Sequence, residues 1–450
     1  MHATQAGFKE IWTNLSSTER DLALVWSMIY EPLTVLEFSR ILNKIGLPPP
    51  LGESRYTHAA TQKITEKLTE LGYLTDRTKQ GWRVNPEHSE ALMRYASIRP
   101  DFNFLLNEIR RELPYKTYWQ PRGPEALMRE IRIAFYQQNE ATYQRLQREA
   151  EMFFPTQARE GYFEAPLFRD FDSRWVETLL PEWQLITVRT AFGRAIDNWE
   201  ALDEVIDFLE SHAQIRDKVS GSLRELLVEA FTLRGEWSRL LLWADLEVVD
   251  WRKDAYQLIY RVLNDEDSRS ASLIESIRKG YRRDFAGKYP ANLAGYLYLI
   301  TLLRSGGVKN AEKIGHYLEQ ADPVERIHLS GLYFVMQALQ AYLRNDLELR
   351  EVAETGIAGA SGNAFLVVFE ALYRLWTGSI NDRNGYLEKL DQRRDKAQEV
   401  GYRWVEMELT KILSIAWQED QIKQAYARRA SDLENELQIN SLVDAMPRIE

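Results

Sequence analysis

The residue types that most often carry catalysis or bind metals are sparse and scattered in this chain. It has no cysteine, and its six histidines form neither an H-x-x-x-H nor an H-E-x-x-H pattern. Gly287-Lys288 lacks the glycine loop and the Ser or Thr of a Walker A motif, and no serine stands in a G-x-S-x-G turn. We therefore expect no catalytic residue, no metal site and no cofactor in these residues.

A different kind of chemistry is indicated by residues 55–84, where basic side chains gather in an acidic protein. The net charge of the whole chain is −10, which argues against a surface coated for general DNA binding. This stretch nevertheless has a basic surplus, with Arg55, Lys63, Lys67, Arg77, Lys79 and Arg83 against Glu66, Glu70 and Asp76. A local surplus of this kind is the electrostatic footprint expected of a DNA contact.

The residues expected to touch DNA fall into two groups. Glutamine suits bidentate contact with adenine and lysine suits guanine or phosphate, so Thr61, Gln62 and Lys63 are expected at the major groove. Basic residues further along would hold the phosphate backbone without reading sequence. The full expected set is Arg55, Thr57, Thr61, Gln62, Lys63, Arg77, Lys79 and Arg83. A protein-docking or purely structural role for the same stretch stays open as an alternative.

The elements that would position these residues follow from apolar spacing and helix caps. Residues 57–71 predict a helix, because apolar residues recur every three or four positions and Gly72 suits a helix end. Residues 73–75 and 82–84 predict two short strands joined by a polar connection. Residues 46–54, with their three consecutive prolines, predict a stiff loop before the helix.

Two further helices are predicted ahead of this stretch, at residues 16–29 and 34–44. Each opens with the Ser/Thr-x-x-Glu pattern of a capping box. Three helices followed by a hairpin predict a winged helix, a variant of the helix-turn-helix motif. In this interpretation residues 57–71 are the recognition helix and residues 75–82 are the wing.

The remainder of the chain reads almost entirely as amphipathic helices with short polar breaks. The breaks at Gly235, Asn264, Gly306, Asn345 and Gly378 recur at roughly 30–40 residues, the period of paired-helix arrays such as tetratricopeptide repeats. Residues 153–181 interrupt the pattern and predict either short strands or an ordered loop. The predicted fold class is mainly α. It comprises a winged helix in residues 1–98, an aromatic and proline-rich linker in 99–124, and a helical repeat scaffold in 125–450 that continues into a further domain.

A second basic patch occupies residues 276–289, where basic and aromatic residues alternate. Its basic members are Arg278, Lys279, Arg282, Arg283 and Lys288. Such alternation suits a single nucleic-acid strand or an acidic partner. We favour the competing interpretation, in which Arg278 and Lys279 complement a helix C-terminus and the aromatic residues belong to the core.

The sequence also bears on location. No apolar run approaches the ~18–20 residues of a membrane span, and the N-terminus has no signal-peptide pattern. Together with the absence of cysteine, this predicts a cytoplasmic protein with no membrane partner.

Residues 68–86, 397–413 and 442–450 resemble the long N-terminal accessory region of large bacterial Swi/Snf-family (DEAD/DEAH-box) helicase-like proteins. The resemblance covers most of the chain but includes none of the ATPase motifs of that family. It implies a non-catalytic, nucleic-acid-engaging scaffold. Its implied partners are duplex DNA and a protein partner or a downstream ATPase domain. The alternative is a stand-alone regulator, in which the helical array binds a protein or an effector and the winged helix is a protein-docking or transcription-factor module.

Overall fold

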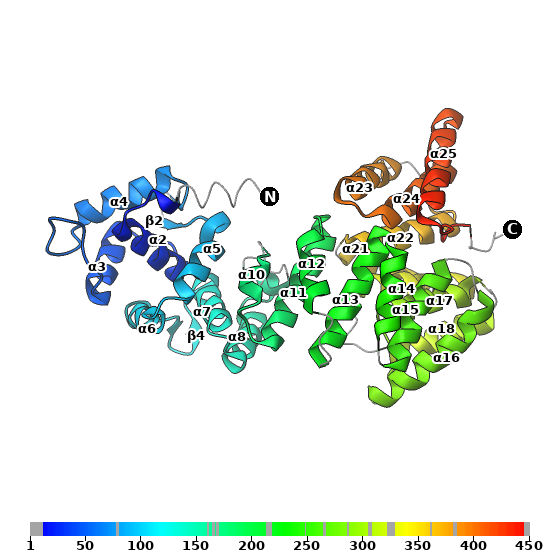
Figure 1. Ribbon diagram of the computed structural model, residues 1–450, viewed down its shortest axis with the longest axis horizontal. Helices are drawn as coiled ribbons and strands as arrows, with labels where there is room; N and C mark the ends of the chain where they lie inside the picture. The colour runs from blue at the N-terminus through cyan, green and yellow to red at the C-terminus, as the bar shows by residue number, and fades with distance from the viewer. Residues whose placement is uncertain are drawn as a thin grey trace. The chain divides into compact units, whose positions relative to one another are not determined.

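The chain is mainly helical and divides into two compact units, Met1–Thr187 and Val188–Glu450 (Figure 1). The computed structural model describes residues 12–77, 81–159, 162–163, 167, 171–212, 218–247, 249–263, 267–285, 288–304, 308–321, 329–360, 362–380 and 385–444. Among these residues, no helix is both long enough and apolar enough to cross a membrane.

The first unit begins with three helices and a two-stranded hairpin. These elements are α2 (Ser17–Ile29), α3 (Val35–Ile45), α4 (His58–Glu70), β1 (Leu74–Arg77) and β2 (Gly81–Val84). Their order matches the order of elements predicted from the sequence. The two aromatic rings at the centre of this part, Trp26 and Phe38, are fully buried and stack with their centroids 4.0 Å apart.

Side-chain caps set the starts of these helices. The Ser16 hydroxyl accepts from the backbone N–H of Glu19, and the Glu19 carboxylate accepts from the Ser16 N–H at 2.8 Å. Thr34 and Glu37 repeat the arrangement at the start of α3. Both predicted capping boxes are therefore confirmed, and each satisfies two backbone donors that the first helical turn leaves without partners.

The hairpin is antiparallel and is joined by a third piece of extended chain. Its register pairs Leu74 with Val84 and Arg77 with Gly81. Leu33, between α2 and α3, exchanges two backbone hydrogen bonds of 2.9 Å with Trp82. Gly81 makes this approach possible, because a Cβ atom there would lie 2.1 Å from the Leu33 carbonyl oxygen.

The first unit continues well past the predicted boundary at residues 99–124. Its further elements are α5 (Pro86–Ser97), α6 (Phe102–Glu112), β3 (Lys116–Thr117), β4 (Gln120–Pro121), α7 (Pro124–Tyr136), α8 (Glu140–Phe153), α9 (Pro155–Arg159) and α10 (Ser173–Val176). The predicted linker thus forms a helix and a small hairpin inside this unit, and the division falls after Thr187. Where residues 153–181 are described, they carry short helices, whereas residues 160–161, 164–166 and 168–170 lie outside the described residues.

Buried arginines on α7 explain why residues 99–124 do not separate two domains. The Arg132 side chain is fully buried and donates to the Glu90 carboxylate at 2.8 Å and to the Ser27 carbonyl at 2.7 Å. The Tyr136 hydroxyl donates to the second carboxylate oxygen of Glu90 at 2.8 Å. Polar side chains on α7 therefore form hydrogen bonds with buried polar groups on α2 and α5, and the three helices belong to one core.

A second buried arginine repeats this arrangement one turn earlier on α7. Arg129 donates to the Glu31 carboxylate at 2.6 Å, to the Leu113 carbonyl at 2.7 Å and to the Glu130 carboxylate at 3.0 Å. Burial raises the pKa of Glu31, although Arg129 and Arg122 act in the opposite direction. A linker with few contacts would leave this carboxylate without its buried partner.

The second unit consists of helices. They are α11 (Pro181–Asn198), which spans the division, α12 (Asp203–His212), α13 (Lys218–Arg234), α14 (Trp237–Leu246), α15 (Asp250–Leu263), α16 (Asp267–Asp284), α17 (Leu293–Arg304), α18 (Val308–Gln320), α20 (Ser330–Arg344), α21 (Leu347–Gly359), α22 (Ala364–Trp376), α23 (Tyr386–Val400), α24 (Arg403–Ala416) and α25 (Asp420–Leu437). The predicted breaks at Gly235, Asn345 and Gly378 lie between helices, and each of these three residues has a positive φ. Those at Asn264 and Gly306 lie outside the described residues.

Contacts far apart in sequence close the second unit on itself. Many consecutive helices pack together, such as α15 with α16 and α24 with α25, and α13 also packs against α24. The Trp199 indole donates to the Gly362 carbonyl at 3.1 Å, and the Tyr402 hydroxyl donates to the Glu200 carbonyl at 2.7 Å. In an open array each repeat contacts only its neighbours. These helices therefore form a closed arrangement.

Candidate nucleic-acid interface

Helix α4 has one buried side and one exposed side. The Thr57 side chain caps its start by accepting from the backbone N–H of Ala60. Leu68 is fully buried in the core, and Ile64 and Leu71 pack against that core. The opposite side carries charged residues, and these are Lys63, Glu66, Lys67 and Glu70.

Two basic residues of this region, one before α4 and one in its first half, are exposed. Arg55 and Lys63 make no ion pair or side-chain hydrogen bond with any residue that the structure describes, and both are exposed. Lys67, one turn further on, pairs with Glu19 at 2.6 Å and so contributes little free positive charge. The uncompensated positive charge on this face therefore lies in the loop before α4, at Arg55, and in the first half of the helix, at Lys63.

The structure corrects the role expected for Thr61. Its side chain is fully buried, and its hydroxyl donates to the Thr57 carbonyl at 2.9 Å, so it is not available to a DNA groove. The physical reason is its position seven residues before Leu68, which places both residues on the same side of the helix. Gln62 is half-buried and donates to the Glu66 carboxylate at 2.8 Å.

Of the hairpin residues in the expected set, the structure describes the side chain of Arg83 but not those of Arg77 and Lys79. Arg83 is half-buried, and its Nε atom is buried without a hydrogen-bond partner among the described residues. Arg77 lies in β1 opposite Gly81, but its side chain lies outside the described residues, as does the whole of Lys79. The described part of the expected DNA surface therefore rests on α4 and the loop before it.

The sequence analysis did not single out two residues of that loop. The Tyr56 side chain is buried and its hydroxyl donates to the Pro48 carbonyl at 2.7 Å. Leu51, at the tip, is fully exposed. The proline run indicated a stiff loop, but no spacing rule indicates that a tyrosine eleven residues after the end of α3 folds back to hold it.

The second basic patch differs from the α4 face because its charges are mostly paired. Arg278 and Lys279 contact Glu275 at 2.9 and 3.2 Å, and Arg283 contacts Asp284 at 2.9 Å. Tyr281 and Tyr289 are buried, and Tyr281 stacks on Phe285 with their ring centroids 4.3 Å apart. Rings that belong to the core cannot stack on bases. Arg282 lies over the Tyr289 ring at 5.5 Å, and Lys288 is half-buried.

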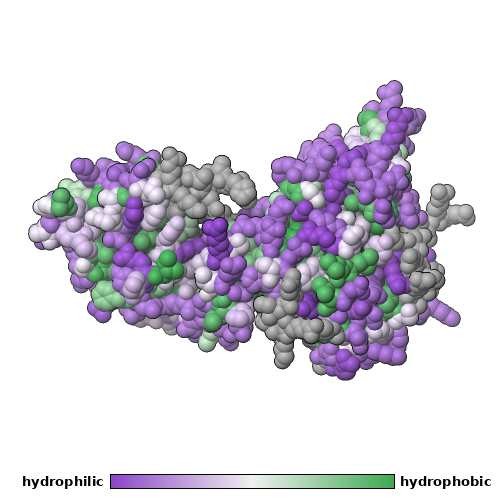
Figure 2. Space-filling model, viewed as in Figure 1, coloured by the Kyte–Doolittle hydropathy of each residue, from purple (hydrophilic) through white to green (hydrophobic). Residues whose placement is uncertain are grey.

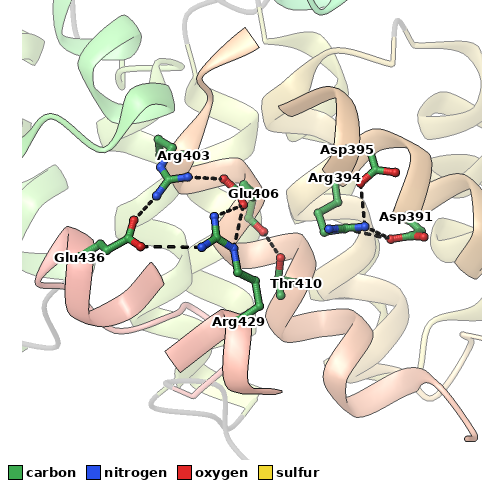
Figure 3. A network of polar contacts seen from close by, with 8 residues as sticks. All are labelled: Asp391, Arg394, Asp395, Arg403, Glu406, Thr410, Arg429 and Glu436. Carbon is green, nitrogen blue, oxygen red and sulfur yellow. Dashed lines mark hydrogen bonds and ion pairs between the residues drawn. The ribbon is translucent and has the colours of Figure 1, made fainter. Parts of the chain in front are cut away.

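The charged clusters of the second unit are also internal. Fully buried Glu406 on α24 accepts from Arg403 at 2.9 Å and from Arg429 of α25 at 2.7 Å (Figure 3). Both arginines also contact Glu436, while Arg394 contacts two aspartates of its own helix (Figure 3). Each carboxylate oxygen of Glu406 already has a cationic partner. This network therefore fastens α24 to α25 and offers no free ligand.

The buried carboxylate of Glu408 makes no ion pair with any residue that the structure describes. Glu408, also on α24, accepts from the Trp404 indole at 3.1 Å, the Ser441 hydroxyl at 2.6 Å and the Leu442 backbone N–H at 2.9 Å. Burial raises the pKa of Glu408 to about 7, although these three hydrogen bonds lower it. This side chain holds the segment after α25 against α24.

The visible surface (Figure 2) is mostly polar, and the comparisons with known proteins found no match. On the face shown in Figure 2, polar side chains cover most of both units and apolar ones lie in small separate groups. Among the described residues, no three His, Asp or Glu side chains are grouped closely enough to hold a metal ion. No family model, no curated protein and no solved structure matches this chain.

Proposed function

We propose that residues 12–98 form a winged helix that engages duplex DNA through the exposed side of α4. The order of three helices and a hairpin supports this fold, as does the pairing of Leu33 with Trp82, which adds a third extended segment to the hairpin. In helix-turn-helix proteins the N-terminal residues of the recognition helix contact base edges in the major groove.

The observation that carries the proposal is a pair of exposed cations, one in the loop before α4 and one in the first half of the helix. Arg55 and Lys63 are exposed and unpaired among the described residues, in a chain with a net charge of −10. Elsewhere in the same unit several arginines serve internal pairs, as Arg99 does with Asp101 at 2.8 Å. Uncompensated positive charge on a solvent-exposed surface attracts a polyanion such as DNA.

Fluorescence anisotropy with a labelled duplex, at several salt concentrations, tests this proposal. Each phosphate contact contributes about 0.9 to the slope of log affinity against log salt. The double variant Arg55→Ala/Lys63→Ala is expected to weaken binding and to reduce that slope by about 1.8, since two contacts are lost. The control is Lys279→Ala, which removes an exposed lysine of the second basic patch.

The outcomes separate DNA binding from protein docking. If affinity does not depend on salt, or if both variants behave alike, the α4 face does not bind DNA, and the domain is a protein-docking module in a stand-alone regulator. If only the α4 variant is affected, the DNA role is supported.

We further propose that the helical second unit is a paired-helix scaffold for a motor domain of the Swi/Snf type or another protein partner. The succession of packed helix pairs supports a scaffold. The measurement is DNA-stimulated ATP hydrolysis by such a motor with and without this chain. Equal rates of ATP hydrolysis with and without this chain would contradict the accessory role.

A further inference from the structure

The connection between α3 and α4 is longer than a helix-turn-helix motif needs. The turn in such motifs is about 3–4 residues long. Here α3 ends at Ile45 and α4 begins at His58, so residues 46–57 form a connection of twelve residues. The loop projects beyond both helices (Figure 1). It leads into α4 and contains Arg55, one of the two exposed cations.

Specific hydrogen bonds hold this loop in one conformation. The Asn43 side chain donates to the Tyr56 carbonyl and accepts from the Tyr56 N–H, both at 2.8 Å. The Tyr56 hydroxyl in turn donates to the Pro48 carbonyl, and the Glu53 N–H donates to the Pro50 carbonyl at 3.0 Å. A loop ordered in this way has already lost its conformational entropy on folding, so a contact made by it costs little further ordering.

The ordered loop presents a polar pocket and an apolar tip. The pocket, of about 510 Å³, is lined by Pro48, Pro49, Ser54 and Arg55 among others. Ser54 and Arg55 are exposed and have no side-chain partner among the described residues, whereas the polar atoms of Asn43 are already used. A hydroxyl donor beside a free guanidinium suits a phosphodiester oxygen.

The charges around the pocket identify the partner as an anion. Glu53 is the single acidic residue of residues 46–57, and it does not line the pocket. Arg55, by contrast, lines the pocket and also begins the α4 face. Leu51, wholly exposed at the tip, supplies the apolar surface that a deoxyribose ring can cover.

We propose that the α3–α4 loop is a second DNA-contacting element that holds the sugar-phosphate backbone beside the groove entered by α4. A phosphodiester would occupy the pocket against Ser54 and Arg55, with Leu51 against the neighbouring deoxyribose. This inference rests on the proposed function of α4, and it adds a DNA contact that α4 alone does not make.

The absence of cysteine from the chain permits a direct test. Leu51→Cys, labelled with a maleimide photo-cross-linker, places the reactive group at the loop tip. The matched control is Leu347→Cys, which is 72% exposed in the second unit. With a labelled duplex and light, the label at position 51 is expected to form at least about tenfold more protein–DNA adduct than the label at 347, and excess unlabelled duplex should abolish it.

Salt titrations of single variants test the phosphate contact separately. Arg55→Ala is expected to lower the salt slope of duplex binding by about 0.9, the value of one phosphate contact. If Lys63→Ala weakens binding and lowers the slope while position 51 gives no adduct above the control, the loop inference is overturned and the α4 role rests on Lys63. If Arg55→Ala keeps the full slope, the phosphate contact in the loop and the two-contact prediction for the α4 face both fail. If the unmodified protein does not bind duplex at all, both proposals fail, and the Leu51 tip is left as a docking point for a protein.

Discussion

Glu408 offers a quantitative test of how the second unit responds to pH. Its fully buried carboxyl group holds Ser441 and Leu442 against α24, and burial raises its pKa to about 7 from an ordinary value of 4.5. The folded state therefore keeps a proton that the unfolded state releases in this range. Between pH 4.5 and 7, the stability contributed by this group falls as pH rises, and it is fully present only below the unfolded pKa.

The size of this effect follows from the shift in pKa. One pKa unit corresponds to about 1.4 kcal/mol, so the shift of Glu408 corresponds to about 3 kcal/mol between the two ends of the range. Since about 1.4 kcal/mol is a factor of ten in an equilibrium constant, local opening of this region should become about a hundredfold more frequent between pH 4.5 and pH 7.

Hydrogen exchange of the α24 and α25 amides, followed by mass spectrometry, measures that opening locally. A local measurement is needed because the chain has two units, and global unfolding of such a chain need not be two-state. The comparison is Glu408→Gln, which cannot ionise. The intrinsic pH dependence of exchange cancels when the two proteins are compared at the same pH.

Glu408→Gln also lowers the stability of this region by a constant amount. Trp404, Ser441 and Leu442 all donate hydrogen bonds to Glu408, and a carboxamide has fewer acceptor sites for them than a carboxylate. That cost does not depend on pH. The ratio of opening constants between the two proteins should therefore change by about two powers of ten across the range. Parallel pH profiles for the two proteins between pH 4.5 and 7 would refute the assignment of the raised pKa to Glu408.

Three further predictions concern the first unit, and each is checked by urea denaturation of the purified variant. Arg132→Met leaves the buried Glu90 carboxylate without its cation and should lower the free energy of unfolding by about 3–5 kcal/mol; a loss below about 1 kcal/mol would contradict the burial of this pair. Gly81→Ala places a Cβ against the Leu33 carbonyl at a residue with φ of +94°, and should lower the free energy of unfolding by more than about 1 kcal/mol. Gly72→Ala, which adds its Cβ to open space, is the comparison and should lower it by less. Thr34→Ala removes a helix cap and should cost about 1 kcal/mol; no change would show that the capping box adds nothing.

Local features of the fold could be predicted from the sequence because they depend on residues close together in the chain. The capping boxes at Ser16 and Thr34 each involve a glutamate three residues later, and the break at Gly235 needs only its own backbone conformation. The proline run before α4 likewise indicated a stiff loop.

Features that depend on distant residues could not be predicted in this way. The boundary was expected at residues 99–124 because prolines and aromatic residues cluster there, yet Arg132 reaches Ser27, which lies 105 residues earlier. The contact of Tyr402 with Glu200 likewise closes the second unit across 202 residues. At the candidate site, Thr61 was misplaced because residue type was weighed above its spacing from Leu68, which alone places it in the core.

The buried pair of Arg132 and Glu90 also limits how this sequence can change over evolutionary time. Replacing either residue alone leaves the other as an unpaired buried charge, at a cost of about 3–5 kcal/mol. That is a large share of the ~5–15 kcal/mol that keeps a typical protein folded. A lineage can therefore exchange the ionic pair for an apolar one only through an intermediate close to unfolding. Relatives of this protein should carry both charges at these two positions or neither.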